Sequence, residues 1–188
     1  MDQITQDNLK RTWDSDKFRE LLLYIATKSA QDPTFGMTKL NKILFLSDFW
    51  SYATKGKAIT WVNYQNLPKG PAPKPLVPVR DELVTEGAAR IDIAQYFGYP
   101  QKRLVALGEP DLSRFTAEEI LLVDRVMGLL EKNNATEVNL ISHRVSRGWQ
   151  ITSEGDLIPY ESVFISSDPP GQADIKRGQQ IAELYSLN

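Results

Sequence analysis

The sequence predicts an α+β fold dominated by helix, with a central buried helix surrounded by other helices and a small antiparallel β-hairpin. Stretches in which apolar residues recur at helical spacing outnumber the stretches that alternate apolar and polar residues. One alternating pattern lies on both sides of a turn, which is typical of a hairpin. Strands and helices do not alternate regularly along the chain, so the pattern does not favour a doubly wound parallel sheet. We therefore expect one domain in which helices pack around a small sheet.

Two helices are expected in the first third of the chain. The first has apolar residues at i, i+3, i+4 and i+7, and Asp14 or Ser15 can cap its start. Its apolar stripe consists of Phe18, Leu21, Leu22 and Ile25. The second runs through MTKLNKILFLSDFWSYATK and has Gly56 as a C-terminal stop. Because apolar side chains cover most of its sides, we expect this helix at the centre of the core.

A proline-rich segment, NLPKGPAPKP, follows a short β-branched and aromatic run. Proline has no backbone N–H, and we therefore expect a loop in polyproline-like geometry that does not join a sheet ladder. Pro78 fits the first turn of a helix that Gly87 can end. The loop can form a rigid rim for a partner, or Gly70 and Pro71 can simply make the turn into this helix.

The second half of the chain contains a hairpin followed by helices. ARIDIAQYFGYPQKRLVALG predicts two strands joined near FGYP. Thr116 to Glu119 form a capping box that begins a helix, and Thr136 can cap another. A terminal helix is expected over residues 173–188. We divide the chain into an N-terminal extension (1–14), a main domain (15–166), and a linker with the C-terminal helix (167–188).

Composition argues against several classes of protein. The net charge is -2 and the sequence pI is near 5.5, so the broad positive field of a nucleic-acid-binding protein is missing and nucleic acid is not an expected partner. The absence of cysteine removes disulfide frameworks and thiolate metal sites. No stretch is long and apolar enough for a signal core or a membrane span. We expect a soluble, cytoplasmic protein.

No stretch carries the pattern of a catalytic centre. His143 is the only histidine, and Ser142 beside it would point about 100° away on a helix, so the two cannot form a serine–histidine relay. A histidine that satisfies its hydrogen bonds at a helix surface is the simpler interpretation, with a hydrolase built around His143 as an alternative. No phosphate-binding glycine motif and no metal-ligand spacing occurs, and we expect neither a metal nor a cofactor.

Polar residues on the central helix need partners. Lys39 and Lys42 can bury their stems and keep their charges in water. Asn41 between them must find hydrogen bonds or be exposed for a purpose. Trp149 and the Pro159–Tyr160 pair fit core and turn positions, and they also fit the aromatic anchors of protein interfaces.

Three stretches resemble, in order, the SocA-like antitoxin family, whose shared unit is the Panacea domain. They are TKLNKILFLSDFW, then GKAITWVNYQNLPKGPAPKPL, then LISHRVSRGWQIT with LIPYE shortly after it. The resemblance covers residues 18–166, and Phe45 stands where the family usually has a tyrosine. It implies a mostly helical α+β domain that is not an enzyme.

The resemblance also implies a partner: a toxin protein encoded next to this one, in bacteria or their phages, which the domain binds and neutralises. One type of member is instead an adaptor that delivers its toxin to a protease, so a proteolytic adaptor is the alternative. A transcriptional regulator and a homo-oligomer also stay open. The partner-binding residues carried over by the resemblance are Lys39, Asn41, Lys42, Gly70, Pro71, Ser142, His143, Trp149, Pro159 and Tyr160.

Overall fold

A computed structural model describes residues 12–96, 99–131, 147–165 and 171–184 of the protein. The elements follow in the order α2 (Ser15–Lys28), α3 (Met37–Lys55), β1 (Tyr64–Leu67), β2 (Gly70–Pro73), α4 (Leu76–Thr85), β3 (Ala89–Tyr96), β4 (Tyr99–Ala106), η1 (Leu112–Arg114), α5 (Ala117–Glu131), α7 (Arg147–Ile151), η2 (Tyr160–Phe164) and α8 (Gln172–Leu184). Within these residues the fold is α+β and mostly helical, as the sequence predicts.

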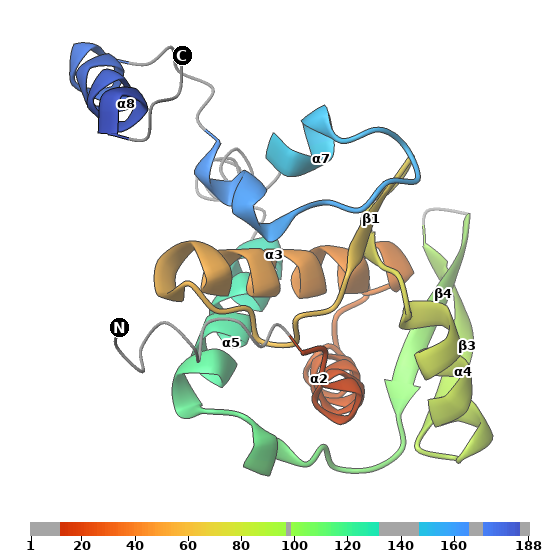
Figure 1. The fold of residues 1–188 in the computed structure, drawn as a ribbon. Helices are drawn as coiled ribbons and strands as arrows, with labels where there is room; N and C mark the ends of the chain where they lie inside the picture. Colours follow the sequence, from red (N-terminus) through yellow and green to blue (C-terminus); the bar gives the residue numbers. More distant parts are fainter. Residues whose placement is uncertain (1–11, 97–98, 132–146, 166–170, 185–188) are drawn as a thin grey trace.

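Helix α3 lies at the centre of the molecule (Figure 1). Helices α2 and α5 lie on one side of it, and β1, η2 and α7 lie on the other. The β3–β4 hairpin and α4 stand near the end where α3 begins. Helix α8 lies outside this body in Figure 1 and buries none of its residues.

Local signals determine where the main helices begin and end. Asp14 caps α2, and its Oδ1 accepts a hydrogen bond from the Lys17 N–H at 2.9 Å. Gly56 ends α3 in the left-handed conformation, at φ 69°. At α5, the Thr116 N–H donates to Glu119 Oε2 at 2.9 Å and the Glu119 N–H donates to Thr116 Oγ1 at 3.2 Å. These contacts confirm the predicted caps and the capping box.

The prediction that the proline-rich segment stays out of a sheet ladder is wrong. β2 pairs antiparallel with β1, with Gly70 opposite Leu67 and Pro73 opposite Tyr64. Just beyond β2, the Lys74 N–H donates to the Asn63 carbonyl at 2.8 Å, and inward-facing N–H groups recur at every second residue of an antiparallel strand. Pro71 and Pro73 therefore occupy the outward positions, where the missing N–H breaks no ladder bond.

The β3–β4 hairpin confirms the two strands predicted from ARIDIAQYFGYPQKRLVALG. Its register runs from Ala89 opposite Ala106 to Tyr96 opposite Tyr99. Ala89 and Leu104 are buried in the core, whereas Ile93 is 68% exposed. The hairpin therefore contributes one side of its sheet to the core near its base, while in its far half Ile93 is exposed and Gln101 donates to the Thr34 carbonyl at 3.1 Å.

Two predicted features of the C-terminal third have different outcomes. The helix expected from Thr136, with Ser142 and His143 on it, lies in residues 132–146, outside the described residues. The terminal helix is confirmed as α8, which spans Gln172–Leu184. In the part of the chain that the structure describes, no helix has both the length and the apolar character needed to cross a bilayer.

Candidate functional site

A buried carboxylate fixes the chain that leads into β1. Asp48, on α3, is fully buried, and it accepts hydrogen bonds from the Thr60 N–H at 2.8 Å, the Thr60 hydroxyl at 2.6 Å and the Tyr64 hydroxyl at 2.8 Å. Burial raises the pKa of Asp48, and the hydrogen bonds offset this shift only in part. A satisfied buried network of this kind holds β1 against α3 in one position.

Trp61 lies in this anchored connection with a strained backbone. Its φ is 57°, a value that few non-glycine residues adopt. The indole packs against the rings of Tyr52 and Tyr160, with centroid distances of 5.7 and 5.3 Å. Tyr160 also donates from its hydroxyl to the Val62 carbonyl at 2.8 Å. The strained residue is therefore held on both sides, by the Asp48 network and by an aromatic cluster.

Asn66 joins β1 to α7. Its side-chain Nδ2 donates to the Trp149 carbonyl at 3.0 Å and to the Thr152 carbonyl at 2.6 Å. In return, the Trp149 indole N–H lies 3.4 Å from the Leu67 carbonyl. Because α7 has only five residues, these contacts supply much of what keeps it in place.

Helix α7 also packs closely on η2. A Cβ at Gly148 would lie only 2.0 Å from Ser162 Oγ and 2.8 Å from Ile158 Cγ2. Glycine is therefore required for this approach. The second edge of β1 is used by the segment between α7 and η2, since the Ile158 N–H donates to the Tyr64 carbonyl at 2.9 Å.

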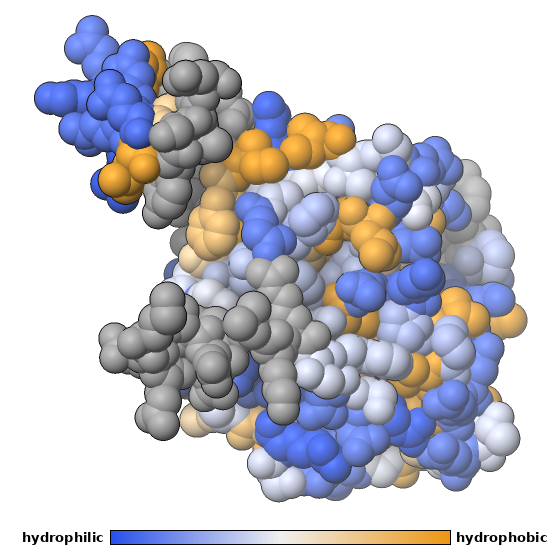
Figure 2. Space-filling model, in the orientation of Figure 1, coloured by the Kyte–Doolittle hydropathy of each residue, from blue (hydrophilic) through white to orange (hydrophobic). Residues whose placement is uncertain are grey.

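Large apolar side chains of α7 and of the segments bonded beside it are accessible, and we call Leu67, Trp149, Ile151 and Leu157 together the α7 face. Leu67 is 38% exposed, Ile151 56% and Leu157 46%, while Trp149 is half-buried. Phe164 and Ile165 add exposed apolar atoms at the end of η2. Figure 2 shows apolar side chains gathered along the upper edge of the face in view, over α7 and η2. Exposed large apolar side chains on a rigid support are typical of protein-binding surfaces.

The structure brings several residues predicted from the resemblance to this region. Gly70, at φ 112°, follows the two-residue turn after Leu67, and Pro71 lies opposite Asn66. Trp149 belongs to the α7 face itself. Tyr160 is buried beneath it with a stacked contact to Phe49, and the exposed Pro159 caps η2. These residues shape or support the surface, and of these only Trp149 belongs to the α7 face.

The other predicted residues lie at the first turns of α3. Lys39 Nζ forms an ion pair with Asp32 Oδ2 at 2.5 Å and a hydrogen bond with Thr34 Oγ1 at 2.8 Å, which closes the loop before α3. Lys42 is exposed, and both lysines line a shallow pocket of about 300 Å³ that includes no residue of the α7 face. Asn41 Oδ1 is buried, and no described residue donates a hydrogen bond to it.

Sequence reasoning did not single out the residues that build the face. Asp48, Asn66, Leu67, Ile151 and Leu157 were not predicted as site residues. Asp48 could have been found as a carboxylate on a helix that apolar side chains cover on most sides. The sequence does not show which groups donate hydrogen bonds to it, because those contacts depend on the fold. Across the described ranges, no group of three histidine, aspartate or glutamate side chains is placed to hold a metal ion.

An α+β domain with a rigidly supported apolar surface is typical of a protein-binding module. The family model described as antitoxin SocA-like, Panacea domain, matches residues 40–150, more than half of the chain. The protein therefore belongs to the SocA-like antitoxin family, as its sequence resemblance indicates. Neither the curated proteins nor the solved structures include a significant match to the chain.

Proposed function

We propose that this protein is an antitoxin that neutralises a toxin encoded by a neighbouring gene, by direct contact through the α7 face. Membership of the SocA-like antitoxin family supports the general role. The observation that supports the contact surface is the exposure of Leu67, Ile151 and Leu157 on α7 and on the segments bonded beside it, together with the half-buried Trp149. Aromatic side chains bordered by aliphatic ones are the usual anchors of protein interfaces.

The support beneath the face favours tight binding. Asn66 fixes α7 from one side and the close contact of Gly148 with Ser162 fixes it from the other. A surface held in its bound shape loses little conformational entropy when a partner docks. We infer that the toxin is inactivated by occupation of its surface, with no cofactor and no reaction catalysed by the antitoxin. The domain limits 15–166 stay a prediction, and the family match lies within them.

The test is co-expression with the neighbouring gene, followed by co-purification. Growth arrest by the neighbour should be relieved by the wild-type chain, and the two proteins should purify together. A double variant, Ile151→Glu with Leu157→Glu, should lower affinity by about 100-fold, because two apolar anchors are replaced by charges that must be desolvated. Leu121→Glu is the matched control, since Leu121 is 67% exposed on α5, away from the face.

Three outcomes decide the proposal. Loss of rescue and binding in the double variant alone, with unchanged thermal unfolding, supports it. Full binding by the double variant contradicts the assignment of the α7 face. Rescue without any complex contradicts direct neutralisation and favours the adaptor, which then predicts that rescue depends on a host protease.

A further inference from the structure

The two edges of the β3–β4 hairpin differ in what covers them. Beside the hairpin, the Leu107 N–H donates to the Ala88 carbonyl at 2.9 Å, which sets the alternation of inward and outward backbone groups. In this alternation Ile91 and Ile93 of β3 direct their N–H and C=O groups away from β4. Pro100 and Leu104 hold the equivalent outward positions of β4.

The β4 edge is closed to a further strand. Pro100 has no N–H to offer, Leu104 is buried, and β4 packs against α2 and α3. Arg103 strengthens this packing, because its guanidinium donates to the Ser29 and Ala30 carbonyls at the end of α2, both at 3.3 Å.

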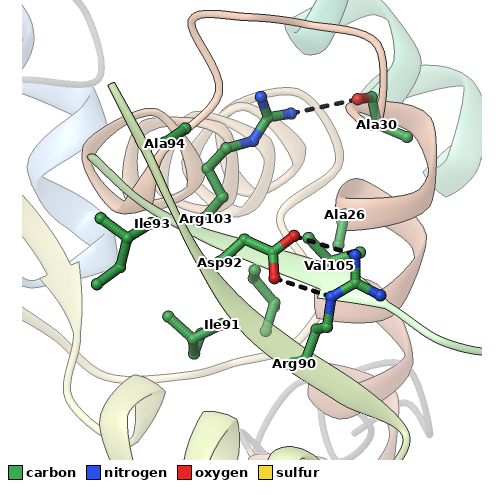
Figure 3. A pocket seen from close by; sticks show the side chains of 10 residues that line it. Ala26, Ala30, Arg90, Ile91, Asp92, Ile93, Ala94, Arg103 and Val105 are labelled. Carbon is green, nitrogen blue, oxygen red and sulfur yellow. Dashed lines mark hydrogen bonds and ion pairs between the residues drawn. The ribbon is translucent and has the colours of Figure 1, made fainter. Parts of the chain in front are cut away.

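The β3 edge is open from Ile91 onward, whereas Ala89 at its start is buried and α4 packs against the strand. No hydrogen bond among the described residues reaches the outward backbone groups of Ile91, Ile93 or Gln95. Ile93 is 68% exposed, and the strand ARIDIAQY contains no proline and no lysine, the residues that usually protect an edge. A groove of about 590 Å³ lies over the hairpin, lined by both strands and by Ala26 and Ala30 of α2, so it does not mark the outer edge of β3. Figure 3 shows Ile91 and Ile93 on one side of β3, with Arg90 and Asp92 on the other.

The charges of β3 complement a second copy of the same strand. Within one chain, Arg90 Nε lies 2.8 Å from Asp92 Oδ1 on one side of the strand. If two β3 strands pair antiparallel about a two-fold axis at Ile91, each Arg90 lies opposite Asp92 of the second copy, and the two isoleucines at position 91 face each other. A register centred on Asp92 would instead place the two Asp92 carboxylates opposite each other. In a register centred on Ile93, neither Arg90 nor Asp92 would lie opposite a residue of the other charge.

We propose that the β3 edge is a self-association site, at which two copies pair over residues 90–92 to form a four-stranded sheet. Because Ala89 is buried, the ladder stops at Arg90, and a ladder of three residues is at the short end of the range for strands in globular proteins. The α7 face takes no part in the pairing, so a dimer would carry two such faces. This proposal does not depend on the identity of the toxin, and it is independent of the antitoxin assignment.

Charge reversal tests the register directly, by sedimentation velocity of the full chain over a concentration series. The wild type should form a reversible dimer. Arg90→Glu alone and Asp92→Arg alone should each weaken the dimer by about tenfold or more, because each places like charges opposite each other. The double variant should recover the dimer, and an equimolar mixture of the two single variants should form a heterodimer that neither forms alone.

Arg80→Glu is the control, because Arg80 also forms a surface ion pair, with Asp81 on α4. It should leave the dimer unchanged, and circular dichroism should show that all variants fold. A chain that stays monomeric at about 1 mM overturns the proposal. So does a dimer whose dissociation constant is the same in both single variants, which would show that another surface pairs.

Discussion

The described residues form two β-hairpins, and these differ in how much of their surface already has a partner. In β1–β2, the strand β1 has β2 on one edge and the Asp156–Ile158 segment on the other, and its side chains reach α3 and α7. In β3–β4, the strands are twice as long, eight residues against four, yet one edge has no partner among the described residues.

This difference shows that strand length does not decide how firmly a hairpin is held. A two-stranded sheet is marginally stable by itself, and its stability comes from what it packs against. The short hairpin is held by a buried carboxylate and a side-chain amide, so it can support a rigid interaction surface. The long hairpin has spare backbone donors and acceptors, so it can add strands. Five predictions test this contrast, from the largest expected effect to the smallest.

Asp48→Ala should damage the short hairpin most. The substitution leaves the Thr60 N–H, the Thr60 hydroxyl and the Tyr64 hydroxyl without their acceptor in a buried site. We expect a loss of about 3 kcal/mol or more in the free energy of unfolding, measured in urea. Asp48→Asn keeps one oxygen acceptor and should lose about 1 kcal/mol. Similar stability of the alanine variant and the wild type would contradict the anchoring role.

The pH dependence of the same variants checks the state of Asp48. Its pKa is raised above the ordinary value of 3.8 in the folded chain, so the ionised form is less favourable in the folded state than in the unfolded state. Its contribution to stability should therefore fall as pH rises from about 3.8 through the higher folded-state pKa. The difference between wild type and Asp48→Asn should show this fall. If the difference in unfolding free energy between wild type and Asp48→Asn did not change with pH, burial would not perturb the pKa of the Asp48 carboxyl.

Gly148→Ala should loosen α7 from η2. The new Cβ would overlap Ser162 Oγ, and forcing extra volume into a packed contact costs about 1–3 kcal/mol. Gly128→Ala on α5 is the matched control, because a Cβ there meets nothing within 4 Å and alanine favours helix. The thermal unfolding temperature should fall for Gly148→Ala and rise for Gly128→Ala. A shift in the same direction for both would contradict the close packing.

Asn66→Ala should weaken the same region by at most about 2 kcal/mol. It removes the two hydrogen bonds that hold the Trp149 and Thr152 carbonyls, at about 1 kcal/mol each. Asn63→Ala, at an exposed position just before β1, should change stability by less than about 0.5 kcal/mol. Urea unfolding of the two variants measures this contrast, and equal losses would show that Asn66 holds nothing specific.

Ile93→Lys should have the smallest effect on the fold. Ile93 is exposed on the open half of the long hairpin, so at low protein concentration the free energy of unfolding should change by less than about 0.5 kcal/mol. A loss above about 1 kcal/mol would show that the β3 edge is packed against something within the chain, which would remove the contrast between the two hairpins.

The sequence predicted best those features that depend on neighbouring residues. The capping box of Thr116 and Glu119 and the terminal glycine of α3 are local, and both are confirmed. β2 was missed because a proline harms a ladder only where its N–H would face the partner, and which residues face inward is set by the pairing with β1.

The site was harder to predict for the same reason. The partners of Asp48 lie 12 and 16 residues away, and Asn66 bonds to carbonyls 83 and 86 residues away. Trp149 and Gly70 came from the family resemblance, while Leu157 is placed beside β1 only by the pairing of Gln65 with Leu157. No sequence pattern specifies such contacts.

The most direct test of the central claim is amide hydrogen exchange of the chain, alone and with its purified toxin. If the α7 face is the contact surface, toxin should slow exchange at residues 64–67 and 149–158 and leave α5 unchanged. The β3 strand should also keep its exchange rates on toxin addition, because self-association does not involve the toxin. Slower exchange on α5 or on the β3–β4 hairpin, with no change at residues 149–158, would contradict the account.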